Sequence, residues 1–84
     1  MNVVVARVVD VTDQVCPMTF VRTKLALEKV AKGDVIEVRL NAGEPLRNVP
    51  RSAAEQGHEI LEIRREDPSL PEGQGVHRIR IRRG

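Results

Sequence analysis

Residues 17–40 read PMTFVRTKLALEKVAKGDVIEVRL, and this stretch combines the signals of a helix, a stop and a strand. Pro17 suits the first turn of a helix, because the N–H group that proline lacks has no intrahelical partner there. Helix-forming residues follow, and Gly33 is typical of the position just after a helix. Apolar and charged residues then alternate over 35–40, which is the pattern of a half-buried strand. The stretch therefore predicts a helix over 17–32 followed by a strand.

The flanking sequence adds three strands and a second helix. β-Branched residues over 3–11 predict a first strand. Apolar residues at helical spacing over 46–57 predict a second helix, whose regular part we expect to begin near Pro50. Alternating patterns predict strands over 59–65 and 76–82, separated by a loop rich in proline and glycine. The order β-α-β-α-β-β with one-sided alternation predicts an α+β fold, a two-layer α/β sandwich in which a four-stranded mixed sheet carries both helices on one face.

Length and composition limit the classes of function. The chain has 84 residues, a formal net charge of +2 and a single aromatic residue, Phe20. A chain of this size predicts one domain, residues 1–84, with no room for a deep active site. The lack of aromatic side chains argues against direct binding of nucleic acid by base stacking. Four arginines near the C-terminus leave two interpretations open, the solvated face of the last strand or a basic docking surface: Arg78, Arg80, Arg82 and Arg83.

The single cysteine, Cys16, excludes an internal disulfide and suits a reducing compartment. The apolar run near the N-terminus is too short for a signal peptide, and no segment approaches the length of a membrane-spanning helix. We therefore expect a cytoplasmic protein with no membrane partner.

Cys16 lies at the predicted N-cap of the first helix, directly before Pro17. The first amides of a helix have no internal partner and carry partial positive charge, so they favour a thiolate over a thiol. The helix dipole contributes roughly 0.3–1 kcal/mol, less than about one pKa unit, so hydrogen bonds from amides would have to supply the rest. The thiolate is the nucleophilic form of cysteine, and the position is suited to sulfur chemistry. The alternative interpretation is a small buried apolar side chain.

Five segments of the sequence resemble the TusA/SirA family of small sulfur-transfer proteins. They are CPMTFVRTK (16–24), ALEK (26–29), KGDVIEV (32–38), RNVP (47–50) and GHEIL (57–61). The resemblance implies the sandwich described above and a catalytic role for Cys16, supported by Pro17. In that role Cys16 accepts sulfane sulfur as a persulfide from a donor such as a cysteine desulfurase. It then passes the sulfur to an acceptor protein in tRNA thiolation, cofactor synthesis or sulfur metabolism.

Two departures from the family pattern flank the expected site. The family motif is usually Cys-Pro-X-Pro, and Thr19 stands in place of the second proline. The common Arg-Asp-Ile-Pro segment contains Asn48 instead of aspartate. The nucleophile is retained, but these changes leave the identity of the donor and acceptor open.

The first helix also carries candidate docking residues. A helical wheel places Phe20, Leu27, Val30 and Ala31 on a core face, with Ala26 beside them. The opposite side is expected to contact either the second helix or a partner protein. The candidate docking residues are Met18, Val21, Arg22, Lys24 and Leu25. Lys24 stands where the resembled family usually has a basic residue.

Three functional hypotheses follow. The first is a sulfur carrier that acts with partner enzymes, and the second is a binding or regulatory module in which Cys16 is incidental. The third, direct binding of nucleic acid, conflicts with the composition. The spacing of His58, His77 and Cys16 matches no compact zinc pattern, so we expect neither a metal site nor a cofactor.

Overall fold

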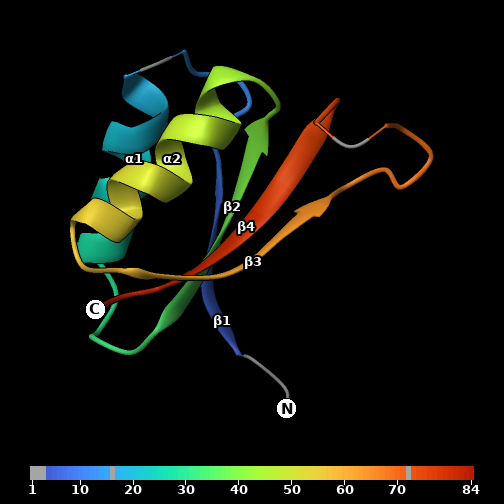
Figure 1. Ribbon diagram of the computed structural model, residues 1–84. Coiled ribbons are helices and arrows are strands. Elements are labelled where there is room, and N and C mark those ends of the chain that lie inside the picture. Colours follow the sequence, from blue (N-terminus) through green and yellow to red (C-terminus); the bar gives the residue numbers. More distant parts are fainter. Residues whose placement is uncertain (1–3, 16, 72) are drawn as a thin grey trace.

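The computed structural model describes residues 4–15, 17–71 and 73–84, and it confirms the predicted order of elements. The elements are β1 (Val5–Asp10), α1 (Met18–Glu28), β2 (Val35–Asn41), α2 (Glu44–Glu55), β3 (Glu59–Arg65) and β4 (Val76–Arg82). Both helices lie side by side on one face of the sheet, and the opposite face is open (Figure 1). In the described part of the chain, neither helix is long and apolar enough to cross a membrane.

The sheet is mixed and has the strand order β1-β2-β4-β3. β1 is parallel to β2, whereas β2 and β3 are both antiparallel to β4. A parallel pair needs a crossover connection, which α1 provides between β1 and β2. The order leaves β1 and β3 as the two edges of the sheet.

The core lies between the two helices and the sheet. Alternate residues of β2 and β4 point into it, as the sequence pattern predicts. The buried apolar residues of the cluster are Val11, Ala26, Leu27, Ile36, Val38, Leu40, Val49, Ala53, Ile79 and Ile81. The two central strands therefore supply half of these side chains, and the helices close over them.

The predicted bounds and core face of α1 need correction. The helix ends at Glu28 rather than at residue 32, because turns replace its last part and the Asp34 carboxylate accepts the Ala31 N–H at 3.0 Å. Ala31 is exposed, and Phe20 and Val30 are only partly buried. Two threonines are buried in their place, Thr19 and Thr23. The Thr23 hydroxyl donates to the Thr19 carbonyl at 2.8 Å, which makes its burial tolerable.

The predicted start of α2 is also wrong. The helix begins at Glu44, directly after Gly43 with a φ of 91°, and contains Pro50 in its interior. Proline there removes one helical hydrogen bond, which disfavours the helix. Val49 and Ala53 are fully buried on the same helix face, and this burial offsets the lost bond.

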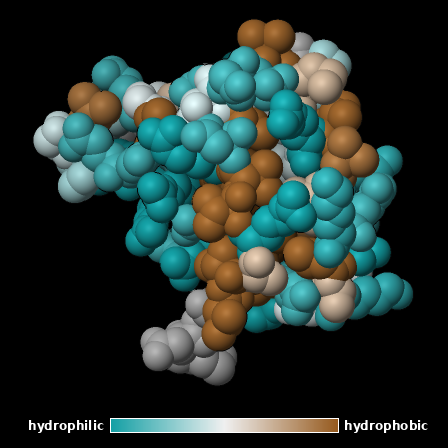
Figure 2. All heavy atoms as spheres, turned by 180° about the vertical axis from the view of Figure 1, so that it is seen from behind, coloured by the Kyte–Doolittle hydropathy of each residue, from teal (hydrophilic) through white to brown (hydrophobic). Residues whose placement is uncertain are grey.

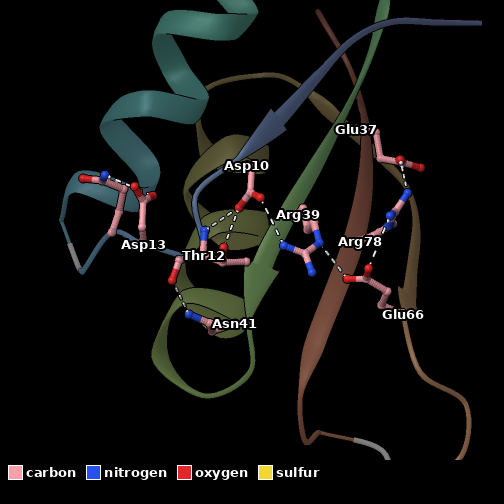
Figure 3. Close-up of polar contacts among 9 residues, drawn as sticks. Asp10, Thr12, Asp13, Glu37, Arg39, Asn41, Glu66 and Arg78 are labelled. Carbon is pink, nitrogen blue, oxygen red and sulfur yellow. Dashed lines mark hydrogen bonds and ion pairs between the residues drawn. The ribbon is translucent and has the colours of Figure 1, made fainter.

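The open face of the sheet carries a charge-balanced network of ion pairs. It contains five arginines and five carboxylates: Arg39, Arg64, Arg78, Arg80 and Arg82 with Asp10, Glu37, Glu59, Glu62 and Glu66. Part of it runs from Asp10 through Arg39 and Glu66 to Arg78 and Glu37 (Figure 3). Arg83, outside this network, donates to the Val30 carbonyl. The C-terminal arginines are therefore the outer face of the last strand and not a free basic docking surface.

Candidate functional site

The first residues of the loop between β1 and α1 are hydrogen-bonded to β2. Val11 is fully buried, and its N–H donates to the Arg39 carbonyl at 2.9 Å. The Asn41 side chain donates to the Thr12 carbonyl at 2.8 Å (Figure 3). The Gln14 N–H donates to the Val11 carbonyl at 3.1 Å. These bonds fix where the chain leaves the sheet and approaches α1.

Asp10 also stabilises this loop through hydrogen bonds. Its carboxylate accepts the Thr12 N–H at 2.9 Å and the Thr12 hydroxyl at 2.6 Å, and it also accepts Arg39 Nη1 at 3.1 Å. The hydrogen bonds from Thr12, followed by the bond from Arg39, lower the pKa of Asp10 from its ordinary value of 3.8. The role of Asp10 is thus to hold the end of β1, and its charge is compensated within the fold.

Acidification is expected to destabilise the protein through such carboxylates. The pKa of Glu66 is lowered from 4.5, first by its hydrogen bond from Arg39, and the pKa of Asp67 is lowered from 3.8 by Ser69. The pKa values of Asp10, Glu66 and Asp67 are lower in the folded protein than their ordinary values. These carboxylates therefore stabilise the folded state above about pH 4.5, and this stabilisation is lost as the pH falls through the lowered pKa values. Urea midpoints measured from pH 7 to pH 2.5 should fall at the acid end.

A matched pair of variants isolates the contribution of Asp10. Asp10→Asn should flatten the acid limb of the stability curve, since the group no longer titrates. Asp13→Asn is the control, because Asp13 contacts only the neighbouring Gln14 side chain among the recorded hydrogen bonds of the described residues. An acid limb of equal slope in Asp10→Asn and the wild type would contradict this assignment.

Cys16 lies outside the described residues, so the site is described from its two neighbours. Val15 and Pro17 are exposed. The Met18 N–H donates to the Val15 carbonyl at 2.8 Å, and the Val21 N–H donates to the Pro17 carbonyl at 3.1 Å. Pro17 is the N-cap of α1 rather than its first helical residue, a shift of one position that is common at helix ends. The prediction that Cys16 is the N-cap is therefore wrong, because the N-cap is the next residue, Pro17.

The five candidate docking residues fall into two groups. Met18, Arg22 and Leu25 lie on one face of α1 and line a groove of about 440 Å³ between this helix and β1. Val21 and Lys24 are exposed but do not line the groove. Met18, Val21 and Leu25, here called the apolar strip, are 43%, 38% and 50% exposed. The apolar strip is therefore exposed, and two of its residues, Met18 and Leu25, line the groove together with residues of β1.

The groove contains residues that the sequence did not single out. Its full lining is Arg7, Val8, Val9, Asp10, Met18, Arg22, Leu25, Ala26 and Lys29. In the view from behind, hydrophobic residues form a band that runs from the lower edge to the centre of the surface (Figure 2). No local pattern could have revealed the contribution of Arg7 and Val8, because it depends on β1 being an edge strand beside α1.

The two histidines occupy structural positions. His77 is buried in β4, with Nδ1 3.1 Å from the Gly75 carbonyl. His58 Nδ1 accepts the Gly84 N–H at 3.1 Å. Within residues 4–15, 17–71 and 73–84, no three His, Cys, Asp or Glu side chains are grouped to hold a metal ion.

The fold is shared with a SirA-like protein. The crystal structure of that protein, from Desulfitobacterium hafniense, matches with a TM-score of 0.66 and 28% sequence identity. The match covers 93% of this chain and 97% of the other. The chain therefore has the fold of a SirA-like protein.

A sequence model described as Sulfurtransferase TusA matches residues 7–83. The chain belongs to this TusA family, as its motifs predict. A relative from Archaeoglobus fulgidus is 41% identical over 56 residues, which cover 67% of this chain and 64% of the relative. The chain thus spans slightly less than two thirds of that relative. A second, from Thermotoga maritima, is 35% identical over 65 residues, covering 77% of this chain and 82% of the relative. Both are named as candidate sulfur carrier proteins.

Proposed function

We propose that the protein relays sulfur by accepting sulfane sulfur as a persulfide on Cys16 and passing it to an acceptor protein. The observation that carries the proposal is the Cys16-Pro17 motif, directly before α1, in a chain of the TusA family. Its relatives named as candidate sulfur carriers support the relay role. The protein acts with partner enzymes and uses no cofactor of its own.

The chemistry is an exchange between thiols and persulfides. The Cys16 thiolate attacks the outer sulfur of a persulfide on a donor such as a cysteine desulfurase. A new S–S bond forms at Cys16, the S–S bond of the donor breaks, and the donor thiolate leaves. The acceptor repeats the same attack on the Cys16 persulfide. Sulfur therefore moves twice without net oxidation or reduction.

The surroundings of Cys16 are suited to this exchange. α1 begins at Met18, so the positive end of its dipole lies next to Pro17 and favours an anionic sulfur there. The exposed apolar strip and the cations Arg22 and Lys24 provide a surface for donor and acceptor proteins. We place the relay in the cytoplasm, where a lone cysteine stays reduced. The acceptor serves tRNA thiolation, cofactor synthesis or sulfur metabolism.

Intact mass spectrometry tests the proposal. After incubation of the reduced protein with a cysteine desulfurase and cysteine, we expect the mass of one added sulfur atom, which a reductant removes. Absence of the added mass, with the thiol shown to be free and a second sulfur donor also failing, would favour the binding module in which Cys16 is incidental.

Removal of apolar side chains from the strip should slow transfer without unfolding the protein. Val21 and Leu25 are already partly exposed, so the variant Val21→Ser plus Leu25→Ser should lose little stability. We expect sulfur transfer from the desulfurase to slow by roughly tenfold, because the partner loses apolar contact area. The matched control is Ile63→Ser plus Leu70→Ser, which changes exposed apolar residues elsewhere. A strip variant that transfers sulfur at the wild-type rate would refute the docking role.

A further inference from the structure

β1 has a free edge of backbone hydrogen-bonding groups. Among the described residues, it pairs with β2 alone. The Val11 N–H, just after the strand, is directed at β2. Because these groups alternate along a strand, the N–H and C=O of Val8 and Asp10 point away from β2. These outward groups are able to pair with another extended chain.

The two edges of the sheet differ in how well they are protected. β3 presents the charged residues Glu59, Glu62, Arg64 and Arg65, and such charges block pairing with a further strand. The β1 edge exposes valines instead, with Val4 83% and Val8 62% exposed. β1 has two charged residues, Arg7 and Asp10, and the Asp10 carboxylate is bonded within the fold, so this edge can accept a peptide strand that offers apolar side chains and carboxylates.

The groove beside this edge is positively charged. Arg7, Arg22 and Lys29 line it, and none of them has an ion pair recorded among the described residues. The one carboxylate in the lining, Asp10, is already bonded to Thr12 and Arg39. An occupant that complements this surface needs apolar side chains for the valines and carboxylates for the cations.

We propose that β1 docks an extended acidic segment of the sulfur donor or acceptor protein, which adds to the sheet beside Val8 and Asp10. Its carboxylates lie against Arg7, Arg22 and Lys29. A second copy of the chain fits less well, since its β1 would bring another Arg7 and supply only Asp10 as an acid. The groove includes Met18, two residues after Cys16, so a bound segment holds its own protein next to the thiol. The identity of the partner rests on the proposed function, but the binding itself does not require Cys16.

The test uses the full chain with Cys16→Ser, labelled with ¹⁵N, at low salt. The probe is a capped ten-residue peptide of alternating glutamate and valine. We expect shifts and slowed hydrogen exchange at the amides of Val8 and Asp10, with no slowing along β3. A peptide in which two central valines are proline cannot complete a ladder and should not bind. Equal binding of this peptide, or no change at the β1 amides, would overturn the proposal.

Charge variants test whether peptide binding depends on the cations of the groove or only on the net charge of the protein. Arg22→Glu plus Lys29→Glu should weaken peptide binding by roughly tenfold. The matched control, Lys32→Glu plus Arg47→Glu, changes the net charge equally at exposed positions outside the groove and should bind almost as well as the parent. Equal weakening by both variants would contradict a docking groove. A dimer in sedimentation that the peptide dissociates would assign the edge to a second copy instead.

The peptide experiment tests the docking strand and the mass experiment tests the sulfur relay, so either proposal can be rejected without the other. Loss of peptide binding while wild-type protein still gains sulfur would reject the docking strand and leave the relay intact. Peptide binding without sulfur gain would reject the relay and leave a binding module that uses β1.

Discussion

Serine in place of Cys16 is expected to abolish the gain of sulfur while leaving the fold unchanged. A hydroxyl group at neutral pH is far less nucleophilic than a thiolate, and the chain has no second cysteine to replace it. Val15 and Pro17 on either side are exposed, so we expect a stability change within about 0.5 kcal/mol. Intact mass after incubation with desulfurase and cysteine measures the first effect, and thermal unfolding measures the second.

Pro17→Ala is the matched control for Cys16→Ser. It changes the neighbouring residue and the N-cap of α1 but keeps the thiol, so the variant should still gain one sulfur atom. Sulfur gain by Cys16→Ser would show that the acceptor is another residue. If Cys16→Ser instead supports the biological role of the wild type in full, the protein is a binding module.

Alanine in place of Glu37 is expected to destabilise the protein strongly. Glu37 is only 5% exposed in the central strand β2, and three arginines lie around its carboxylate. Arg78 and Arg80 approach it at 3.1 and 3.2 Å, and Arg64 approaches it at 3.8 Å. Removal of the shared anion leaves Arg64 without a recorded ion-pair partner among the described residues, and it leaves Arg78 and Arg80 with only Glu66 at 3.4 Å and Glu62 at 3.9 Å. We expect a loss of about 3 kcal/mol in the free energy of unfolding, which lowers the melting temperature by more than about 10 °C in a domain of this size.

Glu62→Ala is the control for the buried position. Its side chain is 45% exposed and lies 3.9 Å from Arg80, so its removal should change stability by less than about 1 kcal/mol. Urea and thermal unfolding of both variants make the comparison. Equal stability of Glu37→Ala and Glu62→Ala would mean that the network acts only as a solvated surface.

The regular elements were predictable where one pattern dominates. β3 and β4 have the predicted bounds, because alternation is clear and a proline- and glycine-rich loop separates them. The core face of α1 was predicted in part: Leu27 and Ala26 are buried as expected, whereas the buried Thr19 and Thr23 were missed because they look polar in sequence. A local hydrogen bond to the backbone satisfies the Thr23 hydroxyl and lets it be buried. Pro50 misled the prediction of α2 for the opposite reason, since tertiary burial of Val49 and Ala53 overrides a local penalty.

The family could be recognised from five sequence segments that begin with Cys16-Pro17, whereas the groove could not be predicted from the sequence. Arg7 and Lys29 lie far apart in the sequence and line the same groove only because β1 pairs beside β2 at the edge of the sheet. Strand order depends on packing among distant segments, and alternation within one strand contains no information about its neighbours. The role of β1 therefore required the three-dimensional structure.

The balanced charges on the open face make the molecule electrically one-sided. Among the described residues, the five arginines of the ion-pair network cancel its five carboxylates, so the net charge of +2 comes from residues outside the network, which include the cations of the groove. A negatively charged partner at a distance therefore exerts little pull on the sheet and a stronger pull on the groove. Such a partner is therefore expected to meet the groove side of the molecule first, which reduces the surface that it has to search.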